Sequence, residues 1–535
     1  MTPSPYAGTL ALLRLDARRD RVLIPVCVLS LALLVVASAQ ATVALYPRDA
    51  SAEATLATMT TPTILAIYGP IAVPGHPDSL AIFKMLLMGG VFLALLVIAV
   101  VRRHTRAEEE SGRTELVGSG VVGRRAQLAA AVALAAATTL VASLLCTAGL
   151  VGIGLDAAGS WAFAASWVTI GLSFTGIAAV AAQLTTTARG CGAWAFGALA
   201  VAYLLRAAGD VAAGPVSALT WASPLGWAEK VAPFSDDRFA VLALPVGFAA
   251  LLLGLAAYLL EHRDLGAGVL PTRPGPATAA PALRSPLALA WRLQRGAFLG
   301  WAVAFALLGA VVGSFTDSIQ DFVQGPEVEE MLRQLGGGGG TLVDTFLAAD
   351  LAFVALGAAA YGISAALRLH SEEAEQHSEL VLSTDTSRWG LLASHTVVAL
   401  GGSALLLLLA GVSAGVVSGA QTDGVLAGVG HLLPTVLAAV PAVWVCVGLA
   451  LLLYGAAPAW SYLAWALLAV FVAVGELGGL LKLPATLVGL SPFQHGQVLP
   501  GESLTSAAPA LAASTLVAAA LLAAAGLTFR RRDLR

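Results

Sequence analysis

Long runs of apolar residues, separated by short polar segments, dominate the chain from one end to the other. A helix needs about 20 apolar residues to cross the hydrocarbon core of a bilayer. Twelve runs approach or exceed that length, so the pattern predicts an all-α polytopic membrane protein with about 12 transmembrane helices. The predicted spans are 22–44, 80–101, 127–155, 161–184, 190–209 and 239–260 in the first half, and 297–316, 346–367, 389–418, 430–455, 459–481 and 507–529 in the second.

The composition agrees with this class of protein. Of the 535 residues, 58% are hydrophobic and only 11% are charged, whereas about 25% of the residues of a soluble domain are charged. The four cysteines lie in or beside apolar runs without CxxC spacing, so we interpret them as small apolar side chains rather than disulfides or metal ligands.

The distribution of arginine and lysine predicts the orientation. If the N-terminus is cytoplasmic, 22 of the 29 cations fall on cytoplasmic segments and seven on the other side. The positive-inside rule therefore predicts that both termini are cytoplasmic, which agrees with an even number of spans.

The most densely charged segment is Arg102–Arg125, between the second and third spans, and it recurs as Arg368–Arg388 between the eighth and ninth. At an offset of 264 residues, eight positions match in one ungapped window, and three of these matches are acidic. Glutamates on a short cytoplasmic helix are not expected in a core. A solvated loop explains one such segment but not its recurrence, so we expect a docking surface for a partner that presents basic residues.

Further matches predict an internal repeat. Ser223-Pro224-Leu225, before the sixth span, recurs 268 residues later as Ser491-Pro492-Phe493 before the twelfth. We predict two parallel six-helix repeats, with a pathway at the interface between them. The predicted organisation is a first half (1–260), a cytoplasmic linker rich in Pro, Gly and Ala (261–285), and a second half (286–535).

Charged residues within or near the spans suggest two ion pairs between the halves. Lys84 and Asp350 occupy nearly equivalent repeat positions, and so do Arg206 and Glu476. The two residues of each set have opposite charges, so one interpretation is an ion pair between the halves near the outer mouth. The other interpretation is that each long side chain reaches the outer membrane interface by itself. The two Ser-Pro elements are expected to begin short outer helices capped by serine.

No motif in the sequence is typical of a catalytic site. GxxxxGK[ST], HExxH, GxSxG and paired Cys/His sets are all absent from the chain. We therefore predict that this chain is not an enzyme, and we expect no metal site, no cofactor and no nucleic-acid partner.

Several of these features together resemble the permease half of type-2 ATP-binding-cassette exporters. They are the six spans per half, an amphipathic N-terminal segment bearing arginines, the acidic loop RAEEESGRTEL after the second span, and the Ser-Pro element before the sixth. Two such halves in one chain resemble the actinobacterial drug and polyketide-antibiotic exporter permeases of the tetronasin type. The resemblance covers essentially the whole chain.

The resemblance implies a multi-pass protein of the bacterial inner (cytoplasmic) membrane that expels a lipophilic or amphipathic small molecule. ATP and Mg would bind a separate cytosolic ATPase subunit, present in two copies, and not this chain. The acidic loops would be coupling helices that fit this subunit, with segments 5–20 and 284–296 as connecting helices beside them. The implied residues are Glu108, Glu109, Glu110, Gly112, Arg113, Glu115, Glu372, Glu373, Glu375 and Glu379 for coupling, Arg14, Arg18, Arg292 and Arg295 for the connecting helices, and Ser223, Pro224, Ser491 and Pro492 for an outer gate.

The second acidic loop departs from the first at three positions. Gln376 and His377 stand where the first loop has Gly112 and Arg113, and Ala374 replaces a glutamate. We therefore expect the first loop to make the stronger contact with the ATPase.

The alternative is a 12-helix, two-repeat secondary transporter driven by an ion gradient. Gly123-Arg124-Arg125 resembles part of the major facilitator loop, but that loop should be short and carry Asp-Arg ahead of the glycine. Proton coupling also calls for carboxylates deep in the spans, and only Asp350 qualifies on this reading. A membrane-embedded enzyme or scaffold is a third and weaker interpretation.

Overall fold

The computed structural model describes residues 4–45, 62–71, 77–212, 214–270, 277–323, 339–422, 424–477 and 484–532. Every regular element within these ranges is a helix, and twelve helical segments are long and apolar enough to cross a membrane. These findings confirm the predicted fold class. The chain forms two compact units, Met1–Gly275 and Pro276–Arg535, and the boundary between them in the sequence falls within the segment predicted to be the linker.

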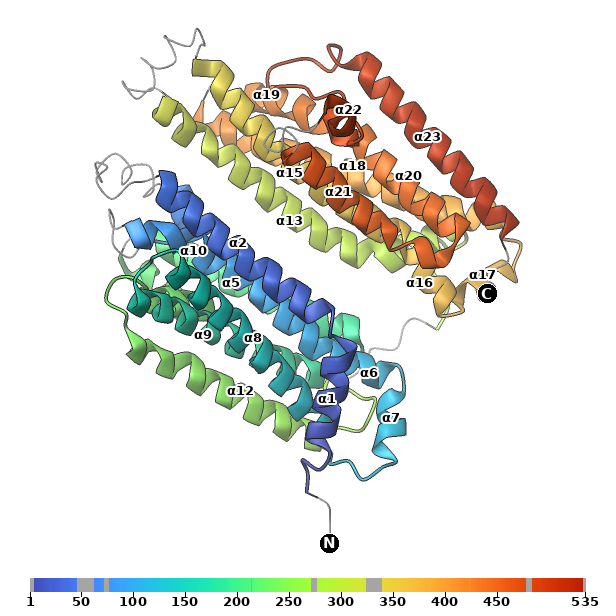
Figure 1. Cartoon of the computed structure of the whole chain (residues 1–535). Coiled ribbons are helices and arrows are strands. Elements are labelled where there is room, and N and C mark those ends of the chain that lie inside the picture. Colours follow the sequence, from blue (N-terminus) through green and yellow to red (C-terminus); the bar gives the residue numbers. More distant parts are fainter. Residues whose placement is uncertain are drawn as a thin grey trace. The chain divides into compact units, whose positions relative to one another are not determined.

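Unit 1 contains six membrane-length helices, and α1, α6 and α7 gather at one of its ends (Figure 1). The long helices are α2 (Leu23–Leu45), α5 (Pro77–His104), α8 (Ala126–Gly152), α9 (Ala157–Leu184), α10 (Ala188–Val211) and α12 (Ala243–Glu261). The shorter ones are α1 (Thr9–Arg19), α4 (Pro62–Tyr68), α6 (Arg106–Glu110), α7 (Arg113–Gly118), η1 (Gly214–Ala222), α11 (Pro224–Lys230) and η2 (Phe239–Leu242).

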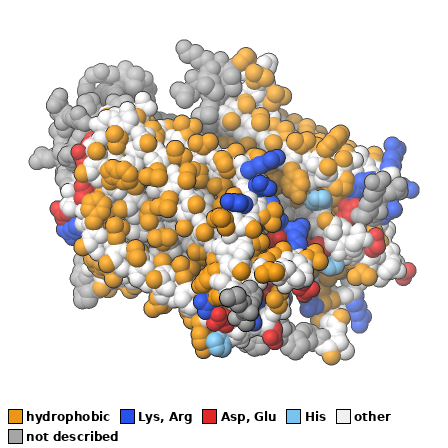
Figure 2. Space-filling view, turned by 60° about the horizontal axis from the view of Figure 1, so that its bottom comes forward, with side chains coloured by type: hydrophobic (Ala, Val, Ile, Leu, Met, Phe, Trp, Pro, Cys, Tyr) orange, Lys and Arg blue, Asp and Glu red, His pale blue; other side chains and the backbone are white. Residues whose placement is uncertain are grey.

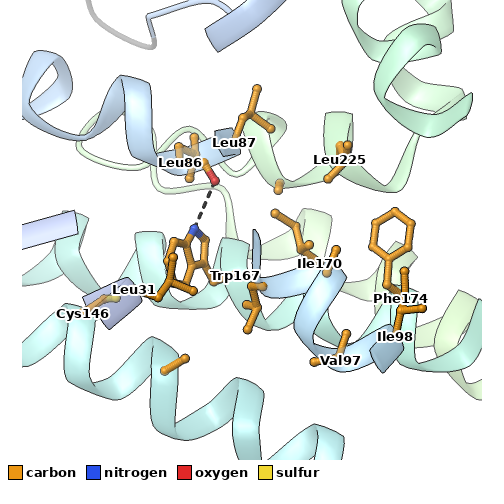
Figure 3. Close-up of a cluster of buried hydrophobic side chains, with 14 of the residues drawn as sticks. Leu31, Leu86, Leu87, Val97, Ile98, Cys146, Trp167, Ile170, Phe174 and Leu225 are labelled. Carbon is orange, nitrogen blue, oxygen red and sulfur yellow. Dashed lines mark hydrogen bonds between the residues drawn. The ribbon is translucent and has the colours of Figure 1, made fainter. Parts of the chain in front are cut away.

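The core of unit 1 is built around α9, in whose most apolar 18-residue stretch 72% of the residues are buried, as expected for a helix surrounded by others. Trp167 at its centre is fully buried and packs with Ile170 and Phe174 (Figure 3). Its indole Nε1 donates to the carbonyl oxygen of Leu86 at 3.1 Å, so the polar atom of this large side chain has a partner inside the apolar core.

In unit 2, as in unit 1, two short helices follow the second membrane-length segment. The membrane-length segments of unit 2 are formed by α13 (Pro286–Val323), α15 (Gly339–Ala366), α18 (Arg388–Gln421), α19 (Val425–Ala438) with α20 (Val440–Ala456), α21 (Leu463–Leu477) and α23 (Ala508–Arg531). The short elements are α16 (Arg368–Ala374), α17 (His377–Leu382), η3 (Pro458–Trp460), α22 (Ala485–Val488) and η4 (Pro492–Gln494).

Two features of unit 2 differ from the sequence prediction. The tenth span, predicted as one helix over 430–455, is a membrane-length segment over Val425–Ala456 with an irregular turn at Ala439 between α19 and α20, where the backbone stays right-handed (φ −80°, ψ −12°). Pro441 explains this irregular turn, because it has no N–H for the carbonyl of Leu437 and its ring crowds that carbonyl; Pro434 lies inside α19, which continues past it to Ala438. The segment 284–296 is not a separate connecting helix, because α13 runs without interruption from Pro286 to Val323.

The N-terminal segment of unit 1 does form a separate helix. Helix α1 ends at Arg19 and α2 begins at Leu23. Pro25 lies in the first turn of α2, where proline is favoured and where it interferes with a helix continuing from the preceding residues. Helix α13 has no proline after its first residue, so nothing comparable interrupts it.

Apolar side chains cover much of the molecular surface, as a lipid environment requires. Leu33, Leu251 and Leu516 are 70%, 65% and 71% exposed. Hydrophobic side chains dominate the face shown in Figure 2, whereas charged side chains are confined to a few groups. The chain is therefore a multi-pass membrane protein whose long helices present apolar surface outward.

Helices α13 and α18 approach each other most closely at two glycines of α13. A Cβ on Gly309 would lie 2.2 Å from the carbonyl oxygen of Ala410, and a Cβ on Gly313 would lie 2.2 Å from that of Ala414. Small residues at a four-residue spacing allow membrane helices to pack backbone against backbone. A Cβ on Gly300 of the same helix would meet nothing within 4 Å.

We therefore expect Gly313→Val to destabilise the purified protein by about 1–3 kcal/mol, because the added side chain meets a backbone that cannot move aside easily. Gly300→Val introduces the same side chain into the same helix at an open position and serves as the control. The midpoint of thermal unfolding in detergent, followed by near-ultraviolet circular dichroism, should fall for Gly313→Val well below that of the control. Equal midpoints would contradict the close packing.

Candidate functional site

The first acidic helix, α6, is held to its own unit by a buried ion-pair network at Glu109. Arg263 binds both carboxylate oxygens of Glu109, at 2.6 and 2.9 Å. Arg106 lies 2.9 Å from the same carboxylate, and the backbone N–H of Gly266 donates to it at 2.7 Å. The exposed fractions of the Glu109 and Arg263 side chains are 7% and 6%. We call Glu109, Arg106 and Arg263 the first lock.

The first lock joins three segments that are far apart in the sequence. Arg106 donates to the carbonyl oxygen of Ala182 at 2.7 Å, and Arg263 donates to the side-chain oxygen of Gln183 at 2.8 Å, both near the end of α9. Both arginines also donate to the carbonyl oxygen of Ala267. Cations are favoured at the C-terminus of a helix. Helix α6, the end of α9 and the segment after α12 are thereby tied together.

A second lock has the same position in unit 2. Glu373 of α16 accepts hydrogen bonds from Arg532 at 2.6 Å and from the hydroxyl of Tyr454 at 2.5 Å. The Arg532 guanidinium also lies over the Tyr454 ring, 4.7 Å from its centroid. We call Glu373, Arg532 and Tyr454 the second lock. In each unit a glutamate of the acidic helix binds an arginine that follows the sixth long helix.

A second set of contacts strengthens this similarity. Arg124, before α8, donates to the carbonyl oxygens of Leu260 and Arg263. Arg388, at the start of α18, donates to those of Arg530 and Arg532 at 3.2 and 2.8 Å. In both units an arginine at the start of the third long helix therefore satisfies carbonyls at the end of the sixth, where helices have free acceptors.

Four of the other predicted coupling glutamates also have partners within their own unit. Glu108 pairs with Arg19 at 2.8 Å and with Arg113 at 3.2 Å. Glu110 accepts from the backbone N–H of Ala188 at 2.8 Å. Glu372 pairs with Arg368 and lies 3.2 Å from His377, which also lies 3.3 Å from Glu375.

The expectation that these glutamates lie outside the core is wrong for part of the set. Glu372 and Glu373 are buried, at 8% and 7% exposure, and the Glu109 side chain is 7% exposed. The physical reason is that each glutamate has an arginine partner, which makes burial of the carboxylate tolerable. A docking role for them stays a prediction.

The exposed part of each acidic loop is its second short helix. Gly112 precedes α7 with φ 73°, and Gln376 precedes α17 with φ 62°. Both residues adopt the left-handed conformation, which glycine reaches easily and glutamine does not. Beyond the turn, Leu116 is 77% exposed and Leu380 is 70% exposed. We call Glu115 with Leu116 the first tip, and Glu379 with Leu380 the second tip; both glutamates are exposed.

Helix α1 is bound to the end of α5 through His104. The imidazole is fully buried, with Asp16 at 3.0 Å from one ring nitrogen and Asp20 at 2.6 Å from the other. Arg103 adds a contact to Asp20 at 3.1 Å. The Nε2–Asp20 contact is a hydrogen bond, whereas Nδ1 lies at ion-pair distance from Asp16 without hydrogen-bond geometry. The four arginines predicted for the connecting helices are exposed: Arg14, Arg18, Arg292 and Arg295.

A charged cluster lies at the opposite end of unit 1. Arg206 is fully buried and lies 3.3 Å from Asp210 and 3.5 Å from Glu229. Its guanidinium also donates to carbonyl oxygens of α4, including that of Ala66 at 2.7 Å. Burial raises the pKa of Glu229 well above its usual range, although the Arg206 charge lowers it. Asp210 and Glu229 escaped the sequence analysis, because both fall in or beside a loop that reads as solvated.

The two predicted ion pairs between the halves, Arg206–Glu476 and Lys84–Asp350, join residues of different units and stay predictions. The Glu476 side chain lies outside the described residues. Lys84 and Asp350 are both half-buried.

The two Ser-Pro elements differ from each other. At the first, the predicted serine cap is confirmed, since Ser223 accepts from the backbone N–H of Leu225 and Pro224 begins α11. At the second, it is wrong, because Pro492 begins only the short 3-10 helix η4 and Ser491 makes no capping hydrogen bond. A gating role for either element stays a prediction.

The titration of Glu229 should appear in the stability of the protein. The native state keeps a proton on this carboxyl at pH values where the unfolded chain has released it, so stability falls as pH rises above the ordinary glutamate value of 4.5. Glu229→Gln should reduce this fall and raise the midpoint of thermal unfolding at the higher pH. Asp236→Asn, at a carboxyl that is 56% exposed, is the control. Identical pH profiles for wild type and Glu229→Gln would refute the assignment.

Comparison with known proteins identifies relatives of this chain. A family model described as the C-terminal domain of the multidrug efflux system permease Rv1217c matches residues 283–530. The chain is 41% identical over 548 residues to the multidrug efflux system permease protein Rv1217c of Mycobacterium tuberculosis. That similarity covers 99% of this chain and 96% of the relative. The chain therefore belongs to the family of multidrug efflux system permeases.

Proposed function

We propose that this chain is the membrane-spanning subunit of an ATP-driven exporter in a bacterial cytoplasmic membrane. It would expel lipophilic or amphipathic small molecules, with both termini cytoplasmic and ATP hydrolysed with Mg on a separate cytosolic ATPase, present in two copies. The relative's name as a multidrug efflux permease supports drug export, and the type-2 cassette exporter resemblance of the acidic loops supports an ATPase partner. Apolar helices facing the bilayer suit a substrate that partitions into lipid.

The observation that carries the proposal is the lock found in both units. Each acidic helix continues directly from the second long helix of its unit and is bound through a buried glutamate to an arginine beyond the sixth. Breaking a buried ion pair by removing one partner costs about 3–5 kcal/mol. A force applied to an acidic helix would therefore reach the second and sixth long helices together, instead of being absorbed by a flexible loop.

The contact surface for the ATPase is assigned to the two tips and not to the lock glutamates. Glu109 and Glu373 are occupied by arginines of their own unit. The first tip and the second tip each combine an exposed carboxylate with a leucine that is at least 70% exposed. Such a surface suits a groove with an apolar floor and a basic rim.

The alternative function is secondary transport driven by an ion gradient. The buried cluster of Arg206, Asp210 and Glu229 favours it, because a carboxyl with a raised pKa can bind and release a proton. This alternative requires transport without an ATPase, and it assigns no role to the repeated locks.

The tips make a direct test of docking. We expect Leu116→Asp to lower co-purification of the cognate ATPase by about tenfold, and Leu380→Asp to lower it less, since one buried apolar anchor at an interface contributes about 1–3 kcal/mol. Leu490→Asp replaces a leucine that is 66% exposed and belongs to neither tip, and it should leave co-purification unchanged. Undiminished capture of the ATPase by Leu116→Asp combined with Leu380→Asp would refute docking at the tips.

A further inference from the structure

Unit 2 contains a cavity of about 300 Å³ that the coupling site does not use. It lies between the middle of α15 (residues 348–355), the irregular turn between α19 and α20, the end of α21 and the segment after η4. Its size is at the lower end of the range of small-molecule sites. The residues that the argument uses are Ala352, Thr435, Ala439, Gly475, Gln494 and Gln497.

The irregular turn at Ala439 forms one wall of this cavity. Thr435, Ala438, Ala439 and Ala442 line it from α19 and α20, around the irregular turn within the span Val425–Ala456. Irregular backbone at membrane depth is tolerated where it is buried in protein or lines a cavity, and interrupted spans often mark the binding sites of transporters. The alanines of α15 form an apolar wall, whereas Gln494 and Gln497 provide a polar edge.

Two hydroxyl groups at the cavity lack hydrogen-bond partners among the described residues. The buried Thr435 hydroxyl lines the cavity. Ser491 is fully buried, and its hydroxyl would lie 3.5 Å from a Cβ on the lining residue Gly475. A buried polar group without a partner is destabilising by about 1–3 kcal/mol, so a ligand that accepts hydrogen bonds here would relieve it.

The matching serine of unit 1 is fully satisfied. Ser223 donates to the carbonyl oxygen of Ala202 at 2.7 Å and accepts from the N–H of Leu225 at 3.2 Å. Near it, unit 1 has the buried cluster around Arg206, which binds carbonyls of α4. In unit 2 the charged groups near this region are the Asp344–His431 pair, one helical turn from Thr435, and His495 in the lining. The cavity itself therefore offers uncharged hydroxyl and amide groups where unit 1 has a buried charged cluster.

We propose that this cavity binds a neutral amphipathic molecule that offers a hydrogen-bond acceptor, such as a carbonyl group, on an apolar body. No Asp, Glu, Lys or Arg occurs among the described lining residues, so a charged ligand would be desolvated without a counter-charge. The acceptor faces the hydroxyls of Thr435 and Ser491, and the apolar body lies against α15. This proposal rests on the proposed export function, since it assigns a class of substrate to unit 2.

Photolabelling with benzophenone tests the proposal, because this neutral diaryl ketone reacts with C–H bonds beside which it is bound. The full-length protein in lipid nanodiscs is irradiated with the probe, and the adducts are located by peptide mass spectrometry. We expect saturable adducts in residues 348–355 and 493–499. Ala352→Phe, which fills the cavity, should lower this labelling by about tenfold. Ala469→Phe, on an exposed position of α21, should leave it unchanged.

Two further arms test the chemistry of the site. Thr435→Val and Ser491→Ala should each lower labelling by about fivefold, the factor expected for one neutral hydrogen bond. Benzophenone-4-carboxylate, which has the same ring system with a negative charge, should not label these segments. Adducts spread evenly over lipid-facing helices, unchanged labelling of Ala352→Phe, or equal labelling by the carboxylate would each overturn the site.

The site and the export function can fail separately. If wild-type protein shows the expected adducts but proteoliposomes containing its ATPase move no benzophenone on addition of ATP, the export function fails for this ligand class and the site stands. If ATP drives transport that Ala352→Phe leaves intact, and the adducts are absent, the site fails and the function stands.

Discussion

The organisation of each unit depends on a buried ion pair between an acidic helix and an arginine beyond the last long helix. Glu109–Arg263 and Glu373–Arg532 are both buried and hydrogen-bonded on several sides. A carboxylate and a guanidinium tolerate burial only with such complete pairing. The locks close each unit between its second and sixth long helices, and they explain why an acidic sequence occurs twice in an otherwise apolar chain.

The two units use the same frame for different purposes at the opposite end. In unit 1, Arg206 pairs with Asp210, lies 3.5 Å from Glu229 and satisfies carbonyls of α4. In unit 2, the irregular turn at Ala439 lies beside a cavity whose described lining carries no Asp, Glu, Lys or Arg. Because the two halves are fused in one chain, their sequences can diverge independently. A feature that one half retains can therefore be absent from the other. The ends that carry the locks remain alike, whereas the opposite ends do not.

Hydrophobic runs were sufficient to predict all twelve spans, since a length of about 20 apolar residues is a strong signal. The position of Pro441 could have predicted the irregular turn at Ala439. The hydrophobic pattern gives no sign of it, because the residues on both sides are apolar. The locks could not be predicted, because Glu109 and Arg263 are 154 residues apart and Glu373 and Arg532 are 159 apart. Local pattern does not reveal such partners. The same limit explains why glutamates expected at a docking surface were found buried, and why Glu229 escaped notice.

The most direct test of the account measures ATP-driven transport when a lock is broken while the tips are intact. Full-length Glu109→Gln and Glu373→Gln variants, each reconstituted with the cognate ATPase, should retain the ATPase and its hydrolysis but lose most transport of a lipophilic dye. Wild-type proteoliposomes should transport only with ATP and not on an imposed proton gradient. Transport by the lock variants at the wild-type rate, or dye movement on the gradient without the ATPase, would contradict the account.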